Sequence, residues 1–268
     1  MIASVLQSVA DYEALRLHDV LNYDKFNYYA IIHHSTTIEG CTLTEIDTQL
    51  LLDEGITPKG KPLEHSLMVK DHYDALLFVL RAAESKTLVS SAFIQQINAK
   101  LMKGTGSVYQ TVFGEIDATK GMFRKGNVSA GSSYFVNYDK VEALTTKLCN
   151  EIIAALPIAD SIEKRLRLSF TAHFDLVSIH PFYDGNGRTC RLLMNYLQQY
   201  FNLPLAIVFK EDKADYYTAL TASRKNEDIG IFQNFMFGQY EKFLNQQVRE
   251  YKDSIDKKDG GSVFSFVF

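Results

Sequence analysis

The sequence has few cysteines, and they follow no recognisable pattern. Cys41, Cys149 and Cys190 are the three cysteines among 268 residues. They form neither a CxxC pair nor an even set, which argues against a disulfide framework and against a structural zinc site. We therefore interpret them as reduced residues that mostly serve packing.

A strong excess of charge of either sign is also lacking. The formal net charge is -4 at pH 7, and the isoelectric point is near 6.0. This balance gives no general attraction to nucleic acid or to anionic lipid. We expect neither a nucleic-acid partner nor a membrane, so a polyanion would have to be bound by a local site.

Long apolar runs are missing as well. The opening residues, MIASVLQSVADYEALRLHD, lack the basic start and the continuous apolar stretch of a signal peptide. No later run approaches the roughly 18 apolar residues that suggest a membrane span. The sequence therefore predicts a cytoplasmic protein, and its 46% hydrophobic content allows a substantial core.

Helical periodicity dominates the chain, which predicts a mainly α fold. Thr42 and Glu45 have the spacing of a capping box, ahead of a helix that Gly55 ends. After the loop ITPKGKP, a long helix should carry Leu67 to Leu80. Further helices are expected at about 90–103, 139–155, 161–178, 187–201, 212–223 and 229–250.

One stretch differs from this pattern. Residues 121–139, GMFRKGNVSAGSSYFVNYD, place Gly, Ser and Asn between short apolar or aromatic pieces. This composition is typical of a β-hairpin, although a plain surface hairpin would look the same.

The most informative segment is residues 180–191, HPFYDGNGRTCR, which lies between two strongly helical patterns. Pro181 prevents the preceding helix from continuing, and the next helix starts within the segment. Free backbone N–H groups and the positive end of the helix dipole favour an anion at such a helix start.

The residue types in this loop suit a polyphosphate. Gly185 and Gly187 allow a nest of N–H donors, and Arg188 and Arg191 share one helical face from which both can reach an anion. Asp184 can hold a hard cation such as magnesium. Nearby, His180 titrates near neutrality and can act as a base. Each residue alone has an ordinary explanation as a cap, a turn or a solvated helix face, but their conjunction does not.

This segment resembles the Fic family signature HPFxDGNGRxxR at every specified position. The resemblance implies a helical core with a β-hairpin flap, and a reaction that transfers AMP from ATP to Ser, Thr or Tyr of a target protein. That the α-phosphorus is attacked comes from the family alone.

The resemblance also implies a role for each position. It makes His180 the general base and Asp184 the ligand of Mg²⁺, with Phe182 anchored in the core. The anion hole and the phosphate clamps would be formed by Gly185, Asn186, Gly187, Arg188 and Arg191.

Two other regions resemble parts of Fic proteins. The predicted hairpin at 121–139 is similar to the flap that docks the target protein by main-chain pairing. Tyr216, Tyr217 and Asn226 lie in a region that borders the nucleotide base in the family. Aromatic core residues at helical spacing would give the same pattern as the two tyrosines.

A motif far upstream, from Ser35 to Gly40, resembles the family's inhibitory pattern [S/T]xxxE[G/N]. The simpler explanation is a helix from about Asp24 that Gly40 ends. That explanation leaves Glu39 unexplained, because a carboxylate in the last turn opposes the helix dipole. The resemblance implies that Glu39 pairs with Arg191 and withdraws it from the γ-phosphate of ATP.

The sequence suggests an N-terminal helical region at 1–60, a Fic core at 61–250 and a tail at 251–268, and it allows a homo-oligomer. Other functions stay open. A Fic-fold enzyme could remove AMP or use another phosphate donor, and a silent module could sense ATP. His18-Asp19 is an isolated dipeptide without the companions of an HD-type phosphohydrolase.

Overall fold

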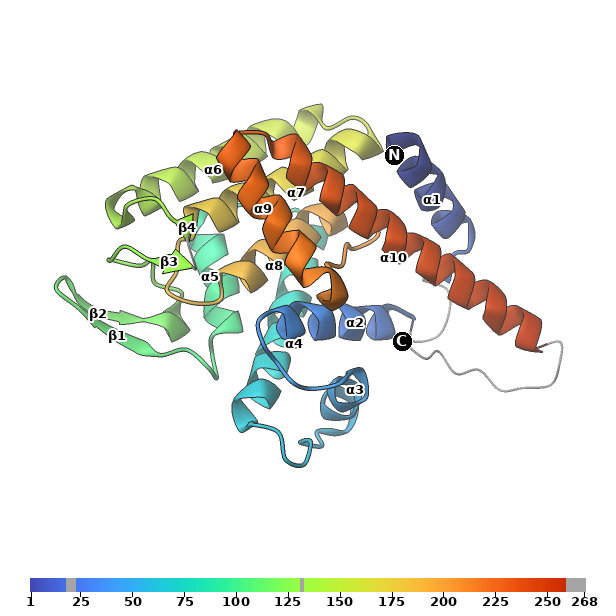
Figure 1. Cartoon of the computed structure of the whole chain (residues 1–268), viewed down its shortest axis with the longest axis horizontal. Helices are drawn as coiled ribbons and strands as arrows, with labels where there is room; N and C mark the ends of the chain where they lie inside the picture. The colour runs from blue at the N-terminus through green and yellow to red at the C-terminus, as the bar shows by residue number, and fades with distance from the viewer. Residues whose placement is uncertain (18–22, 131–132, 259–268) are drawn as a thin grey trace.

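A computed structural model of the chain describes residues 1–17, 23–130 and 133–258. Helices dominate it, with two small antiparallel hairpins at one side (Figure 1). The elements are α1 Ile2–Ala14, α2 Tyr23–Ile38, α3 Glu45–Glu54, α4 Leu63–Glu84, α5 Ser91–Leu101, β1 Val108–Thr111, β2 Gly114–Asp117, β3 Ser129–Ala130, β4 Ser133–Tyr134, α6 Val141–Ala155, α7 Ile162–Ile179, α8 Asn186–Tyr200, α9 Lys213–Asn226 and α10 Ile229–Lys258.

Helix α8 lies at the centre of the molecule (Figure 1). It packs against α7, α4 and α5, and most of its residues are buried. Helix α10 runs along the body beside α1 and also packs on α7 and α9. The buried apolar side chains form one continuous cluster from Val5 near the N-terminus to Leu244 in α10.

The ends of α7 and α8 follow from local sequence. Ser161 caps α7 by accepting a hydrogen bond from the N–H of Lys164, and His180 ends the helix in a left-handed conformation just before Pro181. Gly185 precedes α8 with φ of +76°. A Cβ on Gly185 would lie 2.8 Å from Asn98 Nδ2 and from Met102 Sδ, so only glycine fits there.

The predicted mainly α fold is confirmed, and three details differ from the prediction. The capping box of α3 is formed by Thr44 and Asp47 rather than by Thr42 and Glu45, because Thr44 is the residue whose hydroxyl meets the N–H of the third helical residue. Helix α2 ends at Ile38, so Glu39 lies just after the helix rather than in its last turn, and α10 continues to Lys258, past the expected end at 250.

The hairpins differ more from expectation. Strands β3 and β4 form a short pair inside the predicted flap, with Ser129 opposite Tyr134. A second hairpin, β1 and β2, was not predicted; it pairs Val108 with Asp117 and Thr111 with Gly114.

Other expectations concern composition and the ends of the chain. The three cysteines are free and buried, as predicted. Within the described ranges, no helix combines the length and the apolar character needed to cross a membrane. His18, Asp19 and the last ten residues of the expected tail lie outside the described residues.

Candidate active site

The loop between α7 and α8 is fixed by side chains that bond to its own backbone. Asn186 accepts from the N–H of Phe182 and donates to its carbonyl oxygen, both at 2.9 Å. Phe182 is 1% exposed and packs on Phe123, which confirms the predicted inward anchor. Asn98 on α5 donates to the carbonyl oxygen of Asp184 at 3.0 Å. The side chain of Asn186 therefore shapes the loop, which leaves its backbone N–H as the group available to an anion.

His180 stands at the C-terminal end of α7 with φ of 53° and ψ of 61°. A left-handed backbone costs a residue other than glycine about 1–3 kcal/mol, so the surroundings must impose it. Its imidazole stacks on the ring of Phe135, with ring centroids 3.9 Å apart and an angle of 15° between the ring planes. Burial lowers the pKa of His180 to about 4, so the ring is neutral at pH 7.

Arg188 and Arg191 occupy the first turns of α8 and are almost completely buried. Arg188 makes one side-chain hydrogen bond, from Nη2 to Met102 Sδ at 3.3 Å, and Asp184 Oδ1 lies 3.7 Å from the same nitrogen. Within the described ranges, Arg188 Nε, Arg188 Nη1 and Arg191 Nη1 have no hydrogen-bond partner. Unpartnered buried donors are costly, and an anion bound beside them would satisfy them.

Arg191 is held by α2 and the residue after it. Its Nε donates to Ser35 Oγ at 2.8 Å, its Nη2 donates to the Ser35 carbonyl oxygen at 3.0 Å, and Nη2 also meets Glu39 Oε1 at 2.5 Å. Burial acts to raise the pKa of Glu39, but the charge of Arg191 and their hydrogen bond outweigh it, so the net direction is downward. Glu39 is therefore ionised at neutral pH.

The Glu39 carboxylate lies directly over the start of α8. A Cβ built on Gly187 would be 2.3 Å from Glu39 Oε1 and 3.2 Å from Arg191 Nη1. The missing side chain of Gly187 thus leaves room for an anionic oxygen at the helix N-terminus, where an anion is electrostatically favoured.

Asp184 is the one carboxylate in the sequence of the 180–191 loop, and 56% of its side chain is accessible. Its Oδ1 accepts from the N–H of Gly185 at 2.5 Å. Among the described residues, no group of three or more His, Cys, Asp or Glu side chains is arranged to hold a metal ion. One exposed carboxylate suits Mg²⁺, which takes most of its ligands from water and phosphate.

The three residues expected beside the nucleotide base lie in different environments. Tyr216 is 1% exposed and its hydroxyl lies 3.0 Å from His173 Nε2, so this ring belongs to the core. Tyr217 is 43% exposed, and the charges of Glu39 and Arg191 both act on its pKa. Asn226 is the exposed last residue of α9. Tyr217 is thus the one of the three with an exposed ring within electrostatic range of the site.

Two contacts at this loop have no signal in the sequence. Arg124, in the flap segment, donates from Nε to the His180 carbonyl oxygen at 2.8 Å. Tyr109 of β1 stacks on Tyr183 of the loop, with centroids 4.6 Å apart, so the unpredicted hairpin borders the site. Both contacts join segments far apart in sequence, and neither Arg124 nor Tyr109 belongs to a recognisable motif.

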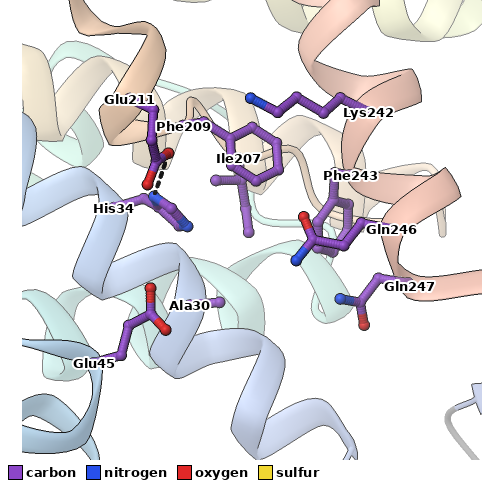
Figure 2. A pocket seen from close by; sticks show the side chains of 10 residues that line it. All are labelled: Ala30, His34, Glu45, Ile207, Phe209, Glu211, Lys242, Phe243, Gln246 and Gln247. Carbon is purple, nitrogen blue, oxygen red and sulfur yellow. Dashed lines mark ion pairs between the residues drawn. The ribbon is translucent and has the colours of Figure 1, made fainter. Parts of the chain in front are cut away.

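A separate cavity of about 290 Å³ lies between α2 and α10 (Figure 2). Ala30 and His34 line one side of it, and Lys242 and Phe243 line the other. Burial lowers the pKa of His34 to about 4, so its 3.9 Å contact with Glu211 involves a neutral ring at pH 7. None of the lining residues belongs to the 180–191 loop.

The Fic/DOC family model matches residues 88–198. Protein adenylyltransferase Fic from Drosophila erecta is 29% identical over 223 residues, which are 81% of this chain and 41% of the fly protein. The Drosophila melanogaster protein of the same name is 28% identical over 219 residues, 81% of this chain and 42% of its own length. The chain thus matches well under half the length of these relatives.

Two solved structures share the fold. A Fic domain containing signaling protein from Bacteroides thetaiotaomicron aligns with a TM-score of 0.78 at 21% identity, over 98% of this chain and 100% of its own. Fic-1 from C. elegans aligns with a TM-score of 0.71 at 22% identity, over 94% of this chain and 72% of its own. Residues 88–198, which include the 180–191 loop and the two helices it joins, therefore match the Fic/DOC family model, and the solved structures show that the chain shares the Fic-domain fold.

Proposed function

We propose that this chain is a protein adenylyltransferase, which moves AMP from ATP to a Ser, Thr or Tyr hydroxyl of another protein, and that Glu39 restrains it. One observation carries the proposal: an anionic oxygen already lies beside Gly187 and Arg191 at the start of α8. Glu39 Oε1 is 2.5 Å from Arg191 Nη2, and it is so close to Gly187 that a Cβ there would lie 2.3 Å away. A site built for a carboxylate at this helix start also suits a phosphate oxygen.

The unpartnered arginine donors support the same conclusion. Arg188 Nε and Nη1 and Arg191 Nη1 are buried and lack partners among the described residues. Bound triphosphate would supply several charged acceptors, and charge-assisted hydrogen bonds of this kind are about twice as strong as neutral ones. The relatives that the chain matches over part of their length are named adenylyltransferases, which agrees with ATP as the donor.

The chemistry assigned to His180 is proton transfer. The neutral imidazole takes the proton of the target hydroxyl while that oxygen bonds to the α-phosphorus, and the bond from the α-phosphorus to pyrophosphate breaks. Arg188 and Arg191 would stabilise the charge that develops on the phosphates. Asp184 is the residue that would hold Mg²⁺, which when bound neutralises part of the triphosphate charge.

The restraint is a competition for Arg191. While Glu39 and Ser35 occupy its guanidinium, Arg191 cannot align with the γ-phosphate. The Arg191 side chain is 4% exposed and that of Glu39 is 27% exposed, so removing Glu39 would leave a buried cation without its partner and would by itself destabilise the protein. Here the triphosphate would replace the lost carboxylate, so the loss of Glu39 should favour productive ATP binding.

We assign the docking site of the target protein to the flap, residues 121–139. The pair β3 and β4 is short, and Phe135, next to β4, contacts the imidazole of His180. A target segment bound along this edge would bring its hydroxyl close to the base, as in other cases of strand addition. Tyr217 is the residue we assign to the adenine, because its exposed ring can stack on a base.

Mass spectrometry of the purified protein tests this function. After incubation with ATP and Mg²⁺, the Glu39→Gly variant should gain the mass of one or more AMP groups, and a chelator should prevent the gain. Addition of phosphate in place of AMP would instead indicate attack at the γ-phosphorus. A different outcome would contradict the proposal: the variant binds ATP, yet neither the variant itself nor any protein of an added cell extract gains a covalent group. The chain would then be a binding module.

A further inference from the structure

Arg124 is among the largest fully buried side chains of the protein, at 1% exposure, although it lies in the Gly-rich flap segment. No carboxylate of the described residues pairs with it. Instead, its guanidinium donates to four backbone carbonyl oxygens. A buried cation that is satisfied only by carbonyl groups holds backbone segments together, so the position of those segments indicates its role.

One set of contacts is made with the end of α7. Arg124 Nε donates to the His180 carbonyl oxygen at 2.8 Å, and Nη2 donates to that of Ile179 at 3.4 Å. The backbone N–H of Arg124 donates to the Pro181 carbonyl oxygen at 3.0 Å. Carbonyl groups at a helix C-terminus lack partners within the helix and carry its negative dipole end, so a guanidinium fits there.

The other contacts are made with the two halves of the flap. Arg124 Nη1 donates to the Gly126 carbonyl oxygen at 2.7 Å, ahead of β3, and Nη2 donates to that of Val136 at 2.5 Å, after β4. Val136 follows Phe135, whose ring stacks on the imidazole of His180. The guanidinium of Arg224 lies 5.6 Å from the Phe135 ring centroid.

We propose that Arg124 is a positioning residue that sets the geometry of His180 and couples it to the flap. The base role of His180 rests on the proposed function, but the positioning of its ring does not. Through one guanidinium, Arg124 fixes both the left-handed backbone of His180 and the segment that places Phe135 on its ring. Movement of the flap is thereby transmitted to the imidazole.

The test compares Arg124→Lys with Arg165→Lys. Lysine keeps the charge but lacks the planar set of donors that bridges four carbonyls. Arg165 is the matched control, because its Nε also donates to a backbone carbonyl, that of Ala159 at 3.0 Å, in a different part of the chain. Both variants are made in the full chain carrying Glu39→Gly, and the His180 imidazole is followed by nitrogen-15 NMR.

Arg124→Lys should shift or split the His180 imidazole signals and lower kcat for AMP transfer by about tenfold or more, because small displacements of a catalytic group are costly. KM for ATP should stay within about twofold, since the arginines of α8 are untouched. Arg165→Lys should leave both readouts unchanged. Phe135→Leu, which removes the stacked ring and keeps Arg124, should shift the imidazole signals too.

An unchanged His180 signal in Arg124→Lys overturns the proposal, and so does a change that Arg165→Lys reproduces. If the parent protein shows no AMP transfer, that absence counts against the proposed function alone. The NMR comparison still decides whether Arg124 positions His180.

Discussion

At the residue scale, the proposed function depends on a histidine, His180, that is partly buried and neutral at pH 7. Replacing His180 with Ala in the Glu39→Gly protein should lower AMP transfer by about 10²-fold or more, because proton removal from the target hydroxyl is lost. The affinity for ATP should change less than about twofold, since the arginines of α8, and not His180, form the proposed phosphate site. Labelled-ATP incorporation and calorimetry measure the two quantities. Near-normal transfer by this variant would remove His180 from the base role.

The pKa of His180 gives a second prediction at this scale. Burial lowers it to about 4, so the ring should stay neutral as the pH falls through 6.5, the ordinary midpoint of a histidine, and gain its proton only below about pH 5. Because the folded-state pKa lies below the unfolded one, this group favours folding at pH above 6.5 and loses that contribution as the pH falls towards 4. NMR titration of the imidazole, assigned by its loss in His180→Ala, measures this. A midpoint near 6.5 would contradict the buried geometry.

At the element scale, the end of α2 explains how Glu39 reaches α8. The N–H groups of Glu39 and Cys41 both donate to the Thr36 carbonyl oxygen at 3.0 Å, and Gly40 donates to that of Thr37. Gly40 adopts φ of +99°, which a residue with a side chain rarely does. This tight ending turns the chain immediately after Glu39. Gly40 was predicted to end the helix, and its backbone conformation agrees with that prediction.

Helix α3 allows a test of the corrected cap. Thr44→Ala should lower the free energy of unfolding by about 1 kcal/mol, because the hydroxyl that satisfies the N–H of Asp47 is lost. Thr42→Ala is the control; it removes an exposed contact with His65 Nδ1 and should cost within about 0.5 kcal/mol. Urea unfolding of the two variants measures the difference. A larger loss in Thr42→Ala would favour the cap expected from the sequence.

The two hairpins mark the limit of pattern-based prediction. The flap segment was recognisable by its Gly, Ser and Asn, and its strands lie within 121–139. The β1 and β2 hairpin turns through Val112 and Phe113, which are 93% and 53% exposed. A turn made of exposed apolar residues carries none of the Asn-Gly or Asp-Gly signals that predict a hairpin. Its strands were therefore not distinguishable from a loop.

At the scale of the whole molecule, local features were predictable and distant contacts were not. The 180–191 loop could be predicted because its glycines, arginines and proline are adjacent in sequence and act on one helix junction. The bonds from Arg124 to the end of α7 and the burial of Tyr216 depend on tertiary packing, which no local pattern records. The division at residue 60 stays a prediction, and one continuous core includes side chains from both sides of it.

The contact between Glu39 and Arg191 joins positions 152 residues apart and was expected from the upstream motif. Its presence is a structural finding, and its effect on activity is the central claim of the proposed function. A structural ion pair and a restraint predict changes in activity of opposite sign when Glu39 is removed. Removing a structural partner would lower activity through lost stability. Removing a restraint would raise activity, even if the protein melts at a lower temperature.

The most direct measurement is incorporation of label from ATP labelled at the α-phosphorus, in wild type, Glu39→Gly, Arg191→Ala and the double variant. Glu45→Gly is the control, since it removes a carboxylate that pairs with Lys210. We expect Glu39→Gly to raise incorporation by about 5- to 150-fold, the range of typical coupling energies. The double variant should lose the gain, and Glu45→Gly should show none. A folded Glu39→Gly protein that is no more active than wild type would contradict the account.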